Sequence, residues 1–479
     1  MLPSQNITQS VVEFIENIQF SDLSPEAISI ASRCMLDTFG LYITGSTEES
    51  VQILIADARA NGGRPDAALL AGNGDKVPAG LAARILGTAG HAQDWDDTQV
   101  RHDPAHAYGM LTHPSVPPLS AALVVAQYLG NVSGKELMLA FQTGFEVECK
   151  ISEWMLPDHY RRGHHSSGTV GTFGACAAAA KLLGLRGEKL AHAIGIAASF
   201  AAGVRCNFGT MTKPLHVGRA AENGVTAALL AQRGFTADPE SLDGRWGFMQ
   251  VLGGGHSPEK KKVGLGHPLT IVSPGVSIKP YPSGILTHQA MDALLELVVE
   301  HDIQPQDVKR IKFYAASNIL EPIRYTLAIN HLQAKFSMQA LLAMIVLRRR
   351  AGPQEFVTAF VGGQAMQSMQ QRVETIHDPE IEAMGYEWIR SRLVLEMADG
   401  RVLEKQADKR YRGGPSKPMS NAEVEEKFMV CTAGMLTPAQ QKTLISDIWS
   451  ICSIDNCTHL LDILGKVEAQ AQQVRLIQK

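Results

Sequence analysis

The polar residues that stand out in this chain form a set suited to acid–base chemistry. Histidine has a pKa near neutrality and can move a proton to or from carbon, while lysine can hold the negative charge that develops beside a carboxylate. The candidates are Asp94, Thr98, His113, His165, Lys213 and Lys279. The sequence shows no Ser-His-Asp elbow, no P-loop and no dinucleotide fingerprint.

The segment 91–98 reads HAQDWDDT and concentrates three carboxylates beside an aromatic residue. If the segment is helical, Asp94 and Thr98 share one face and His91 lies one turn earlier. Such a cluster can bind a metal ion, cap a helix end, or line a substrate pocket in which Thr98 contacts a substrate carboxylate. We favour the substrate pocket.

Two histidines occur directly before expected helices. His113 lies in a proline-stiffened loop (111–117), where a histidine can equally be a hydrogen-bonded structural residue. His165, next to His164, precedes the glycine-rich segment 166–174, whose positive helix end favours a bound carboxylate. We therefore expect His165 in a binding site and keep both interpretations open for His113.

Two lysines lie in stretches where a solvated surface cation is not expected. Lys213 falls within GTMTKPLH (209–216) in an otherwise apolar region, so it needs an anionic partner or a shifted pKa. Lys279 begins the rigid turn KPYPSG (279–284) at the presumed domain boundary, with His288 shortly after it. Clefts between domains are preferred ligand sites, which favours a binding role for Lys279.

Composition places the chain among ordinary globular proteins. Its 479 residues are 45% hydrophobic with a net charge of −4, which excludes intrinsic disorder and a small disulfide scaffold. No run of Lys and Arg is longer than 348–350, which argues against a general nucleic-acid binder. We expect no membrane span and no signal peptide, because no positive N-terminal region and no long apolar run occur.

The cysteines point to a reducing compartment. The chain has 7 of them, an odd number, and none form a C-x-x-C pair. We therefore expect a cytoplasmic protein, and an iron–sulfur cluster is unlikely without closely spaced thiolates.

Helical patterns dominate from the start to about residue 266. Apolar residues recur at helical spacing through 27–39, after a Ser24-Pro25 start, and a capping box begins at Ser133. In the segment 168–180, glycines at every third position run into alanines, which we interpret as close helix packing and not as cofactor binding.

Strand patterns begin later. The segment 311–315 alternates in the strand period, and 393–397 leads through Asp399-Gly400 into a second strand, a hairpin signal. Helix starts return as capping boxes at Ser420 and Thr437.

These patterns predict a mainly α protein with an α+β part. We expect a large all-helical domain, whose first part is 1–270, and a smaller α+β lid domain at 271–405. The C-terminal helices, 406–479, are expected to pack back on the helical domain.

Five ordered motifs across nearly the whole chain resemble those of the MmgE/PrpD family. They are His91-x-x-Asp94-x-Asp96-Asp97-Thr98, Thr112-His113-Pro114-Ser115, Ser167-Gly168-Thr169-Val170-Gly171-Thr172-Phe173-Gly174, Thr212-Lys213-Pro214-Leu215-His216 and Lys279-x-Tyr281-Pro282. Members of that family include 2-methylcitrate dehydratases, cis-aconitate decarboxylases and iminodisuccinate epimerases, which act on small polycarboxylates. The resemblance implies a helical domain with an α+β lid, and a homodimer.

The resemblance also implies roles for individual residues. The six candidates named first match positions that line the active site in the decarboxylase branch. The Thr-Lys-Pro-Leu-His motif is more similar to the decarboxylase and epimerase branches than to the Trp-Lys-Gly pattern of the dehydratases.

Two departures from the decarboxylase branch stand out. The stretch between Thr98 and His113 is longer and offers further pocket groups, namely Arg101, His102, His106 and Tyr108. Gly284 stands where that branch has a histidine, and whether His288 replaces it stays open.

Our first hypothesis is a metal-free lyase of the dehydratase or decarboxylase type, without a cofactor. It would act on a citrate-like or aconitate-like polycarboxylate in the cleft between helical domain and lid. His113 or His165 would carry the proton, Lys213 and Lys279 would hold carboxylates, and Asp94 with Thr98 would orient them. The alternatives are an epimerase of a substituted dicarboxylate and a non-catalytic binding paralogue.

Overall fold

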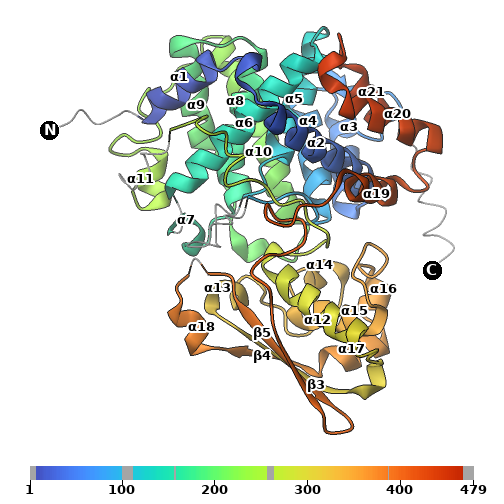
Figure 1. Ribbon diagram of the computed structural model, residues 1–479. Coiled ribbons are helices and arrows are strands. Elements are labelled where there is room, and N and C mark those ends of the chain that lie inside the picture. The colour runs from blue at the N-terminus through green and yellow to red at the C-terminus, as the bar shows by residue number, and fades with distance from the viewer. Residues whose placement is uncertain (1–6, 100–111, 156–157, 256–263, 387, 468–479) are drawn as a thin grey trace.

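The computed structural model describes residues 7–99, 112–155, 158–255, 264–386 and 388–467. It is mainly helical with one four-stranded mixed sheet and one two-stranded sheet, which confirms the predicted fold class. Figure 1 shows most helices gathered in one part of the molecule, with the four-stranded sheet and its own helices below them. Within the described ranges, none of the helices has the length and apolar content needed to cross a membrane.

The helical part contains the first eleven helices and a two-stranded sheet. Their bounds are α1 (Ile7–Asn17), α2 (Pro25–Gly45), α3 (Glu49–Asn61), β1 (Ala67–Ala68), β2 (Lys76–Val77), α4 (Ala79–Ala92), α5 (Val116–Leu129), α6 (Gly134–Met155), α7 (Asp158–Arg161), α8 (Ser166–Leu182), α9 (Gly187–Phe200), α10 (Thr212–Gln232) and α11 (Phe248–Gly253).

The glycine-rich helix α8 lies in the centre of this part, and its residues are buried from Ser166 to Ala180. A Cβ at Gly171 would lie 2.9 Å from Pro117, and one at Gly174 would lie 2.7 Å from the carboxylate of Glu148. The glycines therefore allow α5 and α6 to approach α8 closely, which confirms the packing interpretation.

The region predicted to be the lid, 271–405, carries the four-stranded sheet, whose last strand ends one residue beyond it. Its elements are α12 (His288–Glu300), β3 (Val308–Ala315), α13 (Ser317–Leu320), α14 (His331–Ala334), α15 (Met338–Arg348), α16 (Thr358–Val361), α17 (Gln364–Gln370), β4 (Val373–His377), α18 (Pro379–Ala383), β5 (Ser391–Met397) and β6 (Val402–Gln406). The strand order is β4-β3-β5-β6, with β3 parallel to β4 and antiparallel to β5.

The sheet buries one face. Side chains of β5 alternate between buried and half-buried along its length, as expected for a strand with one face in a core. Helices α12 and α15 contribute the apolar residues that pack in the same core as β3 and β5. Strands β5 and β6 pair as an antiparallel hairpin through Asp399 and Gly400, and Gly400 has a positive φ of 89°. The predicted hairpin is confirmed.

The C-terminal helices α19 (Asn421–Thr432), α20 (Pro438–Trp449) and α21 (His459–Gly465) return to the helical part. Helix α19 packs on α2, and both predicted capping boxes, at Ser420 and Thr437, are present. Phe428 of α19 shares one hydrophobic core with the helical part, while the lid has a second core. The two cores support the proposed domain boundaries, which stay a prediction.

The close crossing of α6 and α8 generates a stability prediction. A Cβ at Gly144 would lie 2.4 Å from the carbonyl oxygen of Gly174, so Gly144→Ala is expected to lower the free energy of unfolding by about 1–3 kcal/mol through overpacking. The control is Gly80→Ala, whose Cβ would lie 3.3 Å from Thr226 Oγ1 and should leave stability unchanged or raise it. Thermal unfolding of both variants measures the difference, and equal melting temperatures would contradict this crossing.

Candidate active site

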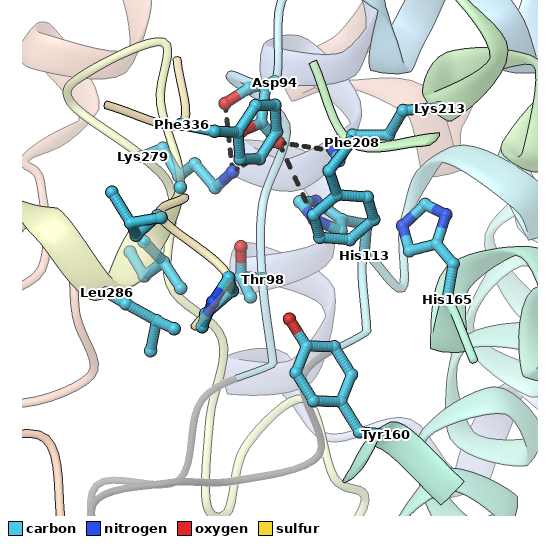
Figure 2. A pocket seen from close by; sticks show the side chains of 14 residues that line it. Asp94, Thr98, His113, Tyr160, His165, Phe208, Lys213, Lys279, Leu286 and Phe336 are labelled. Atoms are coloured by element: carbon cyan, nitrogen blue, oxygen red, sulfur yellow. Dashed lines mark hydrogen bonds and ion pairs between the residues drawn. The ribbon is translucent and has the colours of Figure 1, made fainter. Parts of the chain in front are cut away.

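All six candidate residues line one pocket between the helical part and the lid (Figure 2). Asp94 and Thr98 follow α4, and His113 lies in the loop before α5. His165 is the residue that precedes α8, Lys213 lies in the first turn of α10, and Lys279 comes from the lid. Segments nearly two hundred residues apart in sequence therefore meet in one place.

The chain after α4 turns sharply, and this corrects one expectation. The helix ends at Ala92, and Asp94 has a positive φ of 52°, which a right-handed helix cannot continue. Asp94 and Thr98 therefore do not share a helical face. Instead, Thr98 pairs with the lid residue Ser277 through two backbone hydrogen bonds of 2.9 Å. This bridge brings the Thr98 side chain to the pocket, where its buried hydroxyl has no partner among the described residues.

Asp94 is the centre of the cationic side of the pocket. Its Oδ1 accepts hydrogen bonds from Lys213 Nζ at 2.8 Å and from Lys279 Nζ at 3.1 Å. Burial alone would raise the pKa of Asp94, but the two ammonium groups lower it well below its usual value. Burial lowers the pKa of Lys213, although Asp94 opposes this effect. The lysine has the anionic partner that its apolar surroundings predicted.

Three buried lysines also hold the backbone of this turn. Lys279 donates to the carbonyl of Asp94 at 3.0 Å. Lys335 of the lid donates to the carbonyl of Ala92, and Lys427 of α19 donates to that of Trp95, both at 2.8 Å. The carbonyls at a helix end lack partners within the helix, so these lysines satisfy groups that burial would otherwise leave unpaired.

Sequence reasoning missed Lys335 and Lys427. The burial of Lys427 could have been predicted, because it lies beside Val424 and Phe428 on the apolar face of a predicted helix. The role of Lys335 could not have been predicted, because its partner lies 243 residues away.

His91 was also missed as a site residue. Its Nδ1 donates to the carboxylate of Asp96 at 2.8 Å, and its Nε2 accepts from Lys213 Nζ at 2.7 Å. Burial lowers the pKa of His91 to about 3, so it is neutral and Asp96 determines which ring nitrogen carries the proton. The motif spacing placed His91 near Asp94, and only the turn at Asp94 reveals the contact with Lys213.

His113 lies against the same carboxylates. Its Nδ1 is 3.0 Å from Asp96 Oδ2, and its Nε2 is 3.9 Å from Asp94 Oδ1. Burial lowers the pKa of His113, and Asp96 opposes this shift. The imidazoles of His113 and His91 in turn hold the pKa of Asp96 well below its usual value, against the effect of burial.

Four of these residues have the composition of a metal site. One ligand atom from each of His91, Asp94, Asp96 and His113 lies within 4.8 Å of the others. The expectation of a metal-free pocket therefore stays a prediction. Two ammonium groups already bind Asp94, however, and a divalent cation there would meet their positive charge. The arrangement favours an ammonium-neutralised carboxylate over a metal ligand.

His165 makes a contact with a second imidazole. Its Nδ1 lies 3.0 Å from Nδ1 of His216, so one of the two nitrogens donates and the other accepts. Burial lowers the pKa of both rings, that of His216 to about 4, and nearby Lys213 adds to both shifts. Since Nδ1 of His165 is engaged, Nε2 is its ring nitrogen available to a ligand.

The opposite wall of the pocket is apolar. Phe208 and Phe336 lie beside Lys213, whose Nζ is 5.2 Å and 5.3 Å from the two ring centroids. Gly284 lines this wall together with Ile285 and Leu286. Neither this wall nor the pocket residue Tyr160 was predicted.

His288 does not replace the histidine that Gly284 lacks. Its Nε2 donates to the carbonyl of Ser283 at 3.3 Å, and its ring packs edge-on against Tyr281. Burial lowers its pKa to about 3, and it is not among the residues that line the pocket. The other extra pocket groups considered, Arg101, His102, His106 and Tyr108, lie outside the described residues.

A buried carboxyl with a raised pKa lies behind the turn. Asp97 accepts hydrogen bonds from the backbone and the hydroxyl of Ser115, the residue that precedes α5. Burial, with smaller effects from Asp96 and Asp37, raises the pKa of Asp97 to about 7. Asp37 forms an ion pair of 2.6 Å with Lys427, and burial raises its pKa to about 6.

Comparison with known proteins identifies relatives over nearly the whole chain. The MmgE/PrpD N-terminal domain matches residues 9–261 and the MmgE/PrpD C-terminal domain matches residues 281–451. The chain is 27% identical to the cis-aconitate decarboxylase of Homo sapiens, over 96% of this chain and 95% of that protein. It is 25% identical to that of Mus musculus (98% and 96%) and 24% identical to that of Aspergillus terreus (96% and 96%).

The raised pKa of Asp97 predicts a pH-dependent contribution to stability. A carboxyl group whose folded pKa exceeds its unfolded value stabilises the fold at low pH, and this contribution is lost as the pH rises from about 4 to about 7. The difference in melting temperature between wild type and Asp97→Asn should therefore be more favourable to wild type at pH 5 than at pH 8. Melting temperatures of both proteins at the two pH values measure this. As a control, the exposed Asp399→Asn should show no such pH dependence, because the Arg401 backbone holds the pKa of Asp399 below its usual value. A constant difference for Asp97→Asn would contradict the raised pKa.

Proposed function

This chain belongs to the MmgE/PrpD family, and on that premise we propose that it is a lyase that decarboxylates a small aconitate-like polycarboxylate. The observation that carries the proposal is the meeting of all six motif residues around one pocket, with two lysines and several histidines. Relatives that match nearly the full chain bear the name cis-aconitate decarboxylase, which favours decarboxylation over dehydration.

The charges of the pocket suit a substrate with several carboxylates. The buried lysines Lys213 and Lys279 line it, and Lys335 is buried near them, against the two ionised carboxylates Asp94 and Asp96. The contacts described above use two N–H groups of Lys213 and two of Lys279. An ammonium has three N–H groups, so each lysine can still donate one to a substrate carboxylate.

Decarboxylation of an alkene that carries an allylic carboxylate needs cations and one proton donor. The bond between the methylene carbon and its carboxylate breaks, carbon dioxide leaves, and the electron pair forms a new double bond. The electrons of the old double bond move to the carbon beside a second carboxylate. This carbon then takes up a proton. Lys213 and Lys279 would stabilise the enediolate charge on that carboxylate.

We assign the proton to His113, because it has carboxylates within 4 Å that favour its charged form. The carboxylates of a bound substrate would raise the pKa of His113 further, so binding itself would prepare the acid. His165, which faces His216 and Lys213, would remain neutral and accept or donate a hydrogen bond to substrate through Nε2. Asp94 and Thr98 would orient the substrate.

No cofactor, no metal ion and no nucleic-acid or membrane partner enters this proposal. A homodimer, which family membership suggests, and a cytoplasmic location, which the cysteine pattern favours, stay predictions.

The function is tested by proton NMR of one reaction in deuterated water, run with citrate-like, aconitate-like and aminodicarboxylate substrates. We expect an aconitate-like acid to release carbon dioxide and to yield a methylene alkene with one deuteron beside a carboxylate, with equal turnover after exhaustive chelation. An alkene formed from a citrate-like acid without loss of carbon would indicate a dehydratase. Inverted configuration without loss of a group would indicate an epimerase, and no reaction with any acid would favour a binding paralogue.

Substitution of Lys213 tests the charge-stabilising role. Lys213→Ala should keep the fold and reduce turnover by at least about 100-fold, the scale for removal of one preorganised charge stabiliser. Lys150→Ala is the matched control, because Lys150 is equally buried but pairs with Glu153 on α6, away from the pocket. The control should retain full turnover, and full turnover in Lys213→Ala would make Lys213 structural.

A further inference from the structure

Tyr160 brings a phenol into the pocket at the end away from Asp94. It belongs to the short helix α7, is 6% exposed, and lines the pocket. Figure 2 shows its hydroxyl directed toward the pocket interior, on the side of Thr98 and His113, while the two lysines that bind Asp94 lie at the other end.

A guanidinium lies behind this phenol. The Arg205 guanidinium carbon is 4.1 Å from the centre of the Tyr160 ring, and the backbone N–H of Arg205 donates to the carbonyl of Gly163 at 2.8 Å. Burial raises the pKa of Tyr160, and the charge of Arg205 and its hydrogen bond to the Tyr160 side chain oppose this shift. The hydroxyl therefore stays protonated and donates, while the positive charge behind the ring favours an anion at the hydroxyl.

The pocket thus has two anion-binding ends. Lys213 and Lys279 form one end and the Tyr160 hydroxyl forms the other, while the buried Thr98 hydroxyl, which has no partner among the described residues, lines the same pocket. The apolar residues Phe208 and Phe336 lie along the pocket and offer no hydrogen bond to a third charged group. A ligand that satisfies both ends carries carboxylates on separate carbons.

We propose that the Tyr160 hydroxyl binds a second carboxylate of the substrate and so selects acids with carboxylates on separate carbons over monocarboxylates. The proposal deepens the proposed function and rests on it for the identity of the pocket. Tyr160 is a substrate-binding residue in this assignment, and Arg205 is a positioning residue that acts through the ring.

The test measures binding, so that it does not depend on turnover. Isothermal titration of the full-length protein with propane-1,2,3-tricarboxylate and with butyrate, a monocarboxylate that can reach only one end, compares wild type with Tyr160→Phe. Loss of a hydrogen bond to a charged group is expected to weaken tricarboxylate binding by about 10-fold or more, with little change for butyrate. Tyr314→Phe is the matched control, since Arg392 lies 4.1 Å from the Tyr314 ring on the lid sheet, and it should bind both acids as wild type does.

The outcomes separate this proposal from the proposed function. Selective loss of tricarboxylate affinity supports it even if no acid is turned over, in which case the decarboxylase assignment alone fails. Equal losses for both acids would make Tyr160 a packing residue and overturn the proposal, as would unchanged affinities or a wild type that does not prefer the tricarboxylate. If Tyr160→Phe melts at a lower temperature than wild type, Arg205→Gln is the second variant and should show a smaller selective loss of tricarboxylate affinity. If Arg205→Gln shows no such loss, the proposal is overturned.

Discussion

Three buried lysines hold the backbone carbonyls of the turn that follows α4, and the rest of the site depends on this arrangement. Carbonyls at a buried helix end and in a buried turn must find partners: Lys335 binds that of Ala92 at the end of α4, and Lys279 and Lys427 bind those of Asp94 and Trp95 just after it. One lysine comes from the loop at the start of the lid, one from the lid interior and one from a C-terminal helix. The positions of Asp94 and the residues after it are therefore determined only when all three parts of the chain are assembled.

The same constraint sets the electrostatics of the pocket. Cations needed to hold a buried turn also surround Asp94, and they keep its carboxylate ionised while they disfavour charge on the neighbouring histidines. The pocket thus combines imidazoles of lowered pKa with buried lysine cations, which an anionic ligand would complement. Because binding of carboxylates would shift the histidines toward their protonated forms, the proposed function couples recognition and acid catalysis through one charge balance.

Local patterns explain what the sequence could predict. Caps at Ser420 and Thr437 and the hairpin at Gly400 depend on neighbours within a few residues, and the glycine spacing of α8 is itself a local pattern that indicates close packing; all were predicted correctly. The candidate residues could be named from short motifs, and the structure brings them together. Long-range partners could not be predicted: Lys335 and Lys427 reach the turn from far along the chain, and the positive φ of Asp94 has no sequence pattern. A helix over 91–98 is wrong because of this positive φ at Asp94.

The residues that hold the turn and the residues that meet the ligand overlap only in part. Lys279 serves both purposes, whereas Lys427 lies outside the pocket, and Tyr160 and Gly284 line it without binding the turn. A change at Lys427 would therefore disturb every group that depends on the turn. A change at Tyr160 or Gly284 would alter the shape and hydrogen bonding offered to the ligand while Asp94 and its lysines keep their places. Because of this separation, under the proposed function a change of substrate preference would not require a change in the acid–base groups.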